Sequence, residues 1–141
     1  MTYEEALQEF GLPASPKHCN DIRSLLVEET ERERRGKGQE EILRTLCVQL
    51  FSIGDPEDAL LIWSAKNSSF DMGCGLDIQF LCGAGLEATK AFLAASAASE
   101  ASRALGCLME CEKSGDFRNW SPQKTLTAYR AYYRLEGEPR S

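Results

Sequence analysis

Hydrophobic residues recur every three or four positions through most of this chain, with polar residues between them. That spacing is typical of amphipathic α-helices, because 3.6 residues complete one helical turn. The clearest stripe predicts a helix over residues 39–53, ended by Gly54. Its apolar members are Ile42, Leu43, Leu46, Cys47, Leu50 and Phe51, and the residues we place on its polar side are Glu40, Glu41, Arg44 and Gln49.

Helix start signals divide the rest of the chain. Thr2 with Glu5 forms a capping-box sequence at an amino-terminal helix. Ser15, Asp55 and Ser121 each precede a proline, a pattern that favours a helix start. We therefore expect further helices over 4–10, from 16–21 into the charged stretch 28–39, and over 56–65, 70–82, 86–95 and 122–135, with residues 96–113 forming either a separate helix or a continuation of 86–95.

Residues 70–82 carry only three polar side chains, those of Asp71, Asp77 and Gln79. A helix that is apolar all round is normally enclosed by other helices. We therefore predict that 70–82 is the buried central helix of the domain. Two glycines inside it each cost about 1 kcal/mol relative to alanine, so we expect a neighbouring helix to cross close to that backbone.

Asp77 is the exceptional residue of this segment, because its neighbours one helical turn away are non-polar. A buried carboxylate requires a partner or a proton. One interpretation is structural, in which Asp77 caps a backbone group or pairs with a basic side chain. The candidates for that pair are Lys66, Lys90 and Arg103. In the other interpretation Asp77 is a buried functional acid.

An internal repeat is visible when the sequence is shifted by 31 residues. The repeat predicts a break near Ser96, which would make two helices of residues 86–113. The superposed pairs include Gly54 with Gly85, Leu61 with Phe92, Ile62 with Leu93 and Gly75 with Gly106.

The segment DPEDALLIW, followed by a turn and an apolar second helix, resembles HEAT-like repeats, and residues 113–117 are faintly similar to tetratricopeptide repeats. The resemblance covers about residues 39–115. It implies protein–protein scaffolding through a concave helix face, and it supplies no catalytic residues.

The fold that these patterns predict is all-α, with six to seven antiparallel helices in a short α-solenoid-like stack around residues 70–82. A chain of 141 residues is expected to form a single domain over 1–141. Residues 34–39 should form a charged, glycine-containing loop, and residues 137–141 should fray.

Composition narrows the environment and the partners. The net charge is −6, which disfavours nucleic acid, because phosphate binding depends on lysine and arginine. There is no apolar run near 18 residues, so we expect no membrane span. The chain opens on acidic residues rather than a signal-peptide pattern, and most of its six cysteines lie in apolar helical stretches. We therefore expect a cytoplasmic, reducing location.

Motifs for catalysis and metal binding are missing from the sequence. It contains no P-loop, no G-x-S-x-G and no H-E-x-x-H pattern. We expect a capping or surface role for His18, the only histidine. The cysteines lack the short C-x2-C spacing of zinc sites, so we predict no metal and no cofactor. The chain is therefore expected not to be an enzyme.

The last helix has the composition of an interface hot spot, since Arg130 and Arg134 lie beside its three tyrosines, although its aromatic residues could also serve only to pack it on the core. We predict an adaptor or scaffold that binds another protein, either on this helix or at a groove on the helix over 56–65. Two alternatives stay open: a small-molecule-binding or enzymatic domain that uses Asp77, and an acidic inhibitor of a basic toxin or nuclease. The predicted partner-binding residues are Tyr129, Arg130, Tyr132, Tyr133, Trp63 and Lys66.

Overall fold

The computed structural model describes residues 1–135 and is helical throughout that range, without strands, which confirms the predicted all-α class. It has eight α-helices, more than the six to seven expected, because residues 86–113 form two helices. The predicted fraying of residues 137–141 lies outside the described residues. The α-helices are α1 Tyr3–Phe10, α2 Cys19–Arg34, α3 Glu40–Ile53, α4 Ala59–Lys66, α5 Phe70–Gly75, α6 Leu86–Ala95, α7 Ala101–Lys113 and α8 Pro122–Tyr132, and the 3-10 helices are η1 Pro16–His18, η2 Pro56–Asp58 and η3 Ile78–Cys82.

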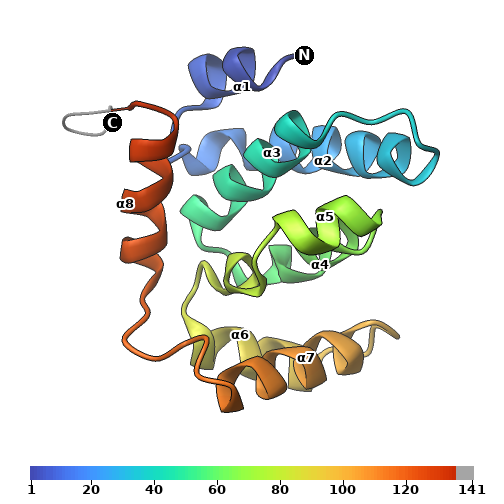
Figure 1. Ribbon diagram of the computed structural model, residues 1–141, viewed down its shortest axis with the longest axis vertical. Helices are drawn as coiled ribbons and strands as arrows, with labels where there is room; N and C mark the ends of the chain where they lie inside the picture. Colours follow the sequence, from blue (N-terminus) through green and yellow to red (C-terminus); the bar gives the residue numbers. More distant parts are fainter. Residues whose placement is uncertain (136–141) are drawn as a thin grey trace.

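The helices lie in successive layers (Figure 1). From top to bottom of that view the layers are α1, the pair α2 and α3, the pair α4 and α5, and the pair α6 and α7. Helix α8 runs along one edge, beside the layers of α2 with α3 and α4 with α5, and the loop after α7 leads up to it. Among residues 1–135, no helix has both the length and the hydropathy that crossing a bilayer requires.

Capping interactions confirm several of the predicted helix ends. The Thr2 hydroxyl accepts a hydrogen bond from the Glu5 amide at 3.1 Å, and the Glu5 carboxylate accepts one from the Thr2 amide at 2.9 Å. Gly54 ends α3 in the left-handed conformation, with a φ of 83°. The gap between α6 and α7, over residues 96–100, confirms the break expected near Ser96.

The prediction of a single buried helix over residues 70–82 is wrong. Helix α5 ends at Gly75, residues 76 and 77 are extended, and η3 begins only at Ile78. One side of α5 faces solvent, since the Phe70 side chain is 84% exposed and Cys74 is also exposed. The buried side of this segment instead belongs mainly to η3.

Lys66 provides a physical reason for the early end of α5. Its ammonium donates hydrogen bonds to the carbonyl oxygens of Gly73, at 2.7 Å, and Leu76, at 2.6 Å. A continuing helix would use those two carbonyls for amides one turn further on. Because Lys66 already bonds these carbonyls and two glycines weaken the helix, ending α5 at Gly75 costs little free energy.

Helix α3 occupies the central position that we had assigned to residues 70–82. It packs against α1, α2, α4, α5, α8 and η3, and most of its residues are buried. Gln49 is fully buried, contrary to its predicted place on the polar side. Its amide nitrogen donates to the carbonyls of Ala6 at 2.9 Å and Gly11 at 3.0 Å, which ties α1 to α3.

Gly83 allows the chain after η3 to approach α3. A Cβ atom at this position would lie 2.3 Å from the carbonyl oxygen of Phe51, a contact that only backbone movement could relieve.

We expect Gly83→Ala to lower the free energy of unfolding by about 1–3 kcal/mol, because two packed backbones must separate. Urea unfolding measures the loss. Gly106→Ala is the matched control, since a Cβ there meets nothing within 4 Å and alanine favours the helix. Equal unfolding midpoints for Gly83→Ala and the wild type would show that the backbones are not this close.

A partly buried ion pair joins α2 to the start of α4. Arg23 Nε lies 2.6 Å from Asp58 Oδ1, and its Nη2 lies 3.2 Å from Asp58 Oδ2 and 3.0 Å from Asp55 Oδ2. The Asp58 side chain is only 3% exposed. Burial raises the pKa of Asp58, and the hydrogen bonds from Arg23 oppose that rise.

Replacing Arg23 with glutamine should cost about 3 kcal/mol of unfolding free energy, because Asp58 would be left buried without its cation. Adding Asp58→Asn to that variant should restore part of the loss. Arg103→Gln is the control, and it should change the stability by no more than about 0.5 kcal/mol, since its pair with Glu100 is exposed. If thermal or urea unfolding showed equally small losses of stability for Arg23→Gln and Arg103→Gln, the stabilising role of the Arg23–Asp58 pair would be contradicted.

Candidate functional site

The predicted partner-binding residues fall into two groups on different helices. Trp63 and Lys66 belong to α4, where Trp63 packs against the hydrophobic core and Lys66 bonds the two carbonyls described above. Tyr129, Arg130 and Tyr132 belong to α8, and Tyr133 follows directly. Because these contacts of Trp63 and Lys66 lie within the protein, α8 is the better candidate for a binding surface.

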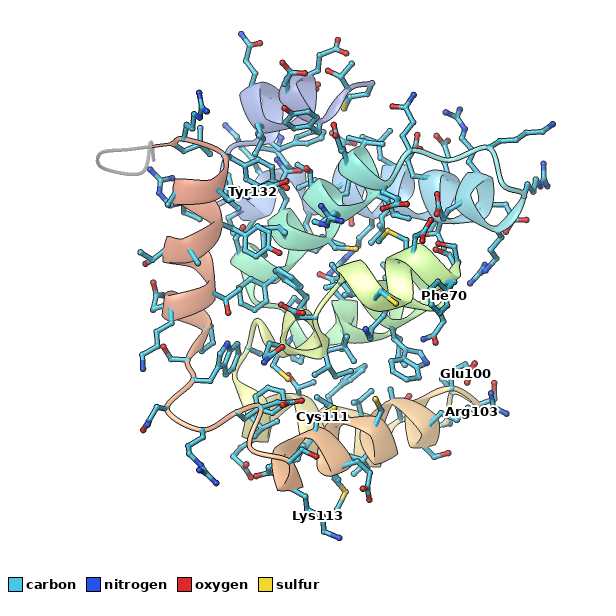
Figure 2. The ribbon with its side chains drawn as sticks, viewed as in Figure 1. Phe70, Glu100, Arg103, Cys111, Lys113 and Tyr132 are labelled. Atoms are coloured by element: carbon cyan, nitrogen blue, oxygen red, sulfur yellow. The ribbon has the colours of Figure 1, made fainter. Side chains whose placement is uncertain are left out.

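Three of the four residues at α8 hold that helix in place. The ring of Tyr129 packs edge-on against Phe80 with centroids 4.9 Å apart, and Arg130 donates to the Leu12 carbonyl. The hydroxyls of Tyr133 and Thr45 lie 2.7 Å apart. Tyr132 differs, because 63% of it is exposed, and Figure 2 labels it beside the upper part of α8.

A line of aromatic rings continues these contacts through the molecule. It starts at Tyr3 in α1, passes through the tyrosines of α8 to η3 and α3, and ends after α7. Contacts between aromatic rings contribute stability beyond that of the apolar area they bury. This line of rings therefore holds α8 against several layers. Successive centroids are Tyr3 to Tyr133 at 6.1 Å, Tyr133 to Tyr129 at 6.2 Å, Tyr129 to Phe80 at 4.9 Å, Phe80 to Phe51 at 5.5 Å, Phe51 to Trp120 at 6.5 Å and Trp120 to Phe117 at 5.3 Å.

A cavity of about 400 Å³ lies where the end of α8 meets α1 and α3. This volume falls within the range of small-ligand sites, about 300–1,000 Å³. We call it the Tyr/Arg cavity. Its lining residues are Tyr3, Glu41, Arg44, Tyr132, Tyr133 and Arg134.

Arg44 is a partly buried cation with incomplete hydrogen bonding. Its side chain is 20% exposed, and its Nη2 lies 4.0 Å from Glu40 Oε2, too far for a hydrogen bond. Its Nε is buried and has no hydrogen-bond partner among residues 1–135. A buried donor left unpaired costs about 1–3 kcal/mol. Arg44 therefore keeps hydrogen-bonding capacity that the fold does not use.

Gly75 explains how Arg44 fits between α3 and α5. A Cβ at this glycine would lie 2.9 Å from Arg44 Nη2, so a larger residue would displace the guanidinium. We had expected a neighbouring helix backbone to approach the glycines of this segment. At Gly73 the nearest atom to an added Cβ is indeed backbone, the Lys66 carbonyl oxygen of α4 at an ordinary contact distance of 3.6 Å, whereas at Gly75 the close neighbour is the side chain of Arg44.

Both half-buried tyrosines keep their protons at neutral pH. Burial raises the pKa of Tyr133 to about 12, although the charge of Arg44 opposes the rise. Burial also raises the pKa of Tyr129, helped by the negative charge of Asp77. Because Thr45 donates its one hydrogen to the Glu41 carbonyl at 2.8 Å, Tyr133 must donate to Thr45.

The prediction that Asp77 is a buried acid is wrong. Asp77 is exposed, and it precedes η3 without making a side-chain cap. A solvated carboxylate needs no partner, so the physical reason for giving Asp77 a special role disappears. Its proposed cations form other contacts: Lys66 with Gly73 and Leu76, Lys90 with Glu87 and Glu112, and Arg103 with Glu100.

Two other clusters have less suitable chemistry. A larger hollow beside the loop over 35–39 is lined by several carboxylates, and burial together with the charge of Asp71 raises the pKa of Glu40 there. On α7, burial and the neighbouring Cys107 raise the pKa of Cys111 to about 11, which keeps the thiol protonated. Within residues 1–135 no group of three or more His, Cys, Asp or Glu side chains is placed to hold a metal ion.

No protein-family model, curated protein or solved structure matches this chain. The chemistry of the Tyr/Arg cavity therefore carries the functional assignment. Among its residues, sequence reasoning missed Tyr3, Glu41 and Arg44. The only available signal was the tyrosine-rich last helix, because nothing local in the sequence reveals a contact between residues 88 positions apart, such as Thr45 and Tyr133.

Tyr133→Phe should reduce the alkaline sensitivity of the protein. Because the folded-state pKa is about 12 and the unfolded value is about 10, protonated Tyr133 stabilises the fold fully below pH 10. This contribution is lost as the pH rises through 12. We therefore expect the unfolding free energy of the wild type to fall more steeply between pH 10 and 12 than that of Tyr133→Phe.

At pH 7 the same variant should lose about 1 kcal/mol with its hydrogen bond to Thr45. Urea unfolding at several pH values measures both effects. The buried cysteines also respond to alkali, but they are present in both proteins and cancel in the comparison. If the unfolding free energies of the two proteins changed in parallel with pH, the raised pKa of Tyr133 would be contradicted.

Proposed function

We propose that the protein is a non-enzymatic binding protein whose partner, another protein, docks at the Tyr/Arg cavity. The observation that carries this proposal is Arg44, a partly buried guanidinium with an unpaired Nε, held beside tyrosine side chains. Tyrosine and arginine are enriched where binding energy concentrates at protein interfaces. Glu41, Tyr132 and Arg134 are the exposed members of the cavity lining, so they are the first groups a partner would meet.

Binding fits this cavity better than catalysis. Within residues 1–135 its lining contains no histidine, cysteine or serine, so that part of the chain offers no nucleophile with a neighbouring base there. The single histidine, His18, packs its ring against Phe10 with centroids 5.2 Å apart.

We infer that the hairpins α4–α5 and α6–α7 are two copies of a HEAT-like unit. The start of α7 at Ala101 follows the start of α5 at Phe70 by the same 31 residues that relate the two sequences. The layered arrangement in Figure 1 also supports this interpretation. Helical repeat proteins commonly present extended surfaces to partners. The six free cysteines favour a reducing, cytoplasmic location.

Tyr132→Ala tests the docking surface, because Tyr132 is exposed and its removal keeps the Tyr129–Phe80 and Tyr133–Thr45 contacts of α8, at the loss of its ring contacts with Tyr129 and Tyr133. Tyr129 and Tyr133 are unsuitable, since their loss would loosen α8 itself. We expect Tyr132→Ala to reduce recovery of a specific partner at least about tenfold in quantitative affinity capture, the effect of losing a hot-spot residue.

Met109→Ala is the matched control. Met109 is 52% exposed on α7, outside the lining of the Tyr/Arg cavity. This variant should recover the partner at the wild-type level, and circular dichroism should show the same helicity for all three proteins. Wild-type recovery by Tyr132→Ala, or equal losses in both variants, would reject the proposed surface.

A further inference from the structure

We propose that the group recognised by the Tyr/Arg cavity is a carboxylate carried on an apolar body, as at the carboxyl terminus or an acidic residue of a docking segment. This inference rests on the proposed function and names the chemistry of the ligand at the same site. Three properties of the cavity support it: its charge, its donors and its walls.

The charged side chains that line the cavity suit a ligand with one negative charge. Among the lining residues within 1–135, Arg44 and Arg134 contribute two positive charges and Glu41 contributes one negative charge, which leaves a net charge of +1 for that part of the lining. Glu40 lies 4.0 Å from Arg44 but lines the carboxylate-lined hollow rather than this cavity, whereas Glu41 lines both. A carboxylate would therefore balance the cavity, whereas a doubly charged phosphoryl group would leave it negative.

The donors of the cavity suit a planar oxyanion. The guanidinium of Arg44 is rigid and planar, and its paired N–H groups match the two oxygens of a carboxylate. The buried Nε is out of a ligand's reach, but Nη2 lies 4.0 Å from Glu40 without a hydrogen bond to it, so the terminal nitrogens are the ones that would form such a pair. Tyr3 and Tyr132 line the same space, and each carries a hydroxyl that can donate or accept a hydrogen bond. Tyr133 contributes an acceptor and a ring face, because its proton is directed to Thr45.

The walls of the cavity leave room for more than the anion. The rings of Tyr132 and Tyr133 meet edge-on at 5.0 Å, and Tyr133 lies 6.1 Å from Tyr3, so three aromatic side chains border the space. A volume of about 400 Å³ is much larger than a carboxylate group needs. An aryl or branched aliphatic body would occupy the remainder against those rings.

The first experiment uses 3-phenylpropionate as the probe, titrated into the full-length protein and followed by protein NMR shifts at low ionic strength. For a fragment of this size we expect a dissociation constant on the order of 1 mM. The neutral isostere 3-phenylpropanamide should bind at least about tenfold more weakly, because it lacks the charge that Arg44 recognises. Phenyl phosphate, which carries two charges, should also bind more weakly than 3-phenylpropionate.

Variants locate the probe within the cavity. Arg44→Gln should abolish binding, Arg44→Lys should retain only part of it, and Arg103→Gln should behave as the wild type because Arg103 lies on α7. Glu41→Gln should strengthen binding several-fold, because it removes the opposing charge from an exposed position. An increase in affinity cannot come from loss of fold, so this variant keeps the test decisive if Arg44→Gln unfolds.

Several results would overturn the inference: equal binding of the amide, tighter binding of phenyl phosphate, no gain in Glu41→Gln, or no binding of 3-phenylpropionate by the wild type. None of these outcomes would affect the docking proposal, which depends on partner capture by Tyr132→Ala and Met109→Ala. Conversely, probe binding that survives in Tyr132→Ala while partner capture is unchanged would support the carboxylate site and reject the docking surface.

Discussion

The burial of α3 on nearly every side is the constraint that sets the arrangement of its neighbours. A helix with so little solvent-facing surface needs packing partners all round, and it obtains them from α1, α2, α4, α5, α8 and η3. Two of its buried polar side chains bond to those partners: the Gln49 amide nitrogen donates to the carbonyls of Ala6 in α1 and Gly11 just after it, and the Thr45 hydroxyl bonds to that of Tyr133 at the end of α8. The core and its attachments are thus one hydrogen-bonded unit.

The Tyr/Arg cavity is a by-product of how α8 is attached. Tyr129, Arg130 and Tyr133 are directed inward to hold the helix across the layers, which leaves Tyr132 and Arg134 at the surface. Arg44 emerges from α3 into the same junction. A ligand bound there would contact both the central helix and the last helix, so its binding free energy would also stabilise the attachment of α8.

The candidate site could be predicted only in part. The tyrosine-rich composition pointed to the correct helix, because enrichment of aromatic residues is visible without any structure. It did not indicate which tyrosine is exposed, since Tyr132 and Tyr133 are adjacent in sequence but one is mostly exposed and the other bonds to Thr45. Arg44 was placed on a solvent-facing side, and its role depends on Gly75 and α8, which are remote in sequence.

The sequence by itself determined where most helices begin and end, because capping boxes, proline starts and left-handed glycines act over only a few residues. Thr2, Gly54 and Ser121 are examples that the structure reproduces. Only the tertiary structure decided which helix is central, where α5 stops and whether Asp77 is buried. Those properties depend on side chains that arrive from other helices, such as Lys66 at the end of α5, and on which faces other layers cover, and hydrophobic periodicity carries no information about either.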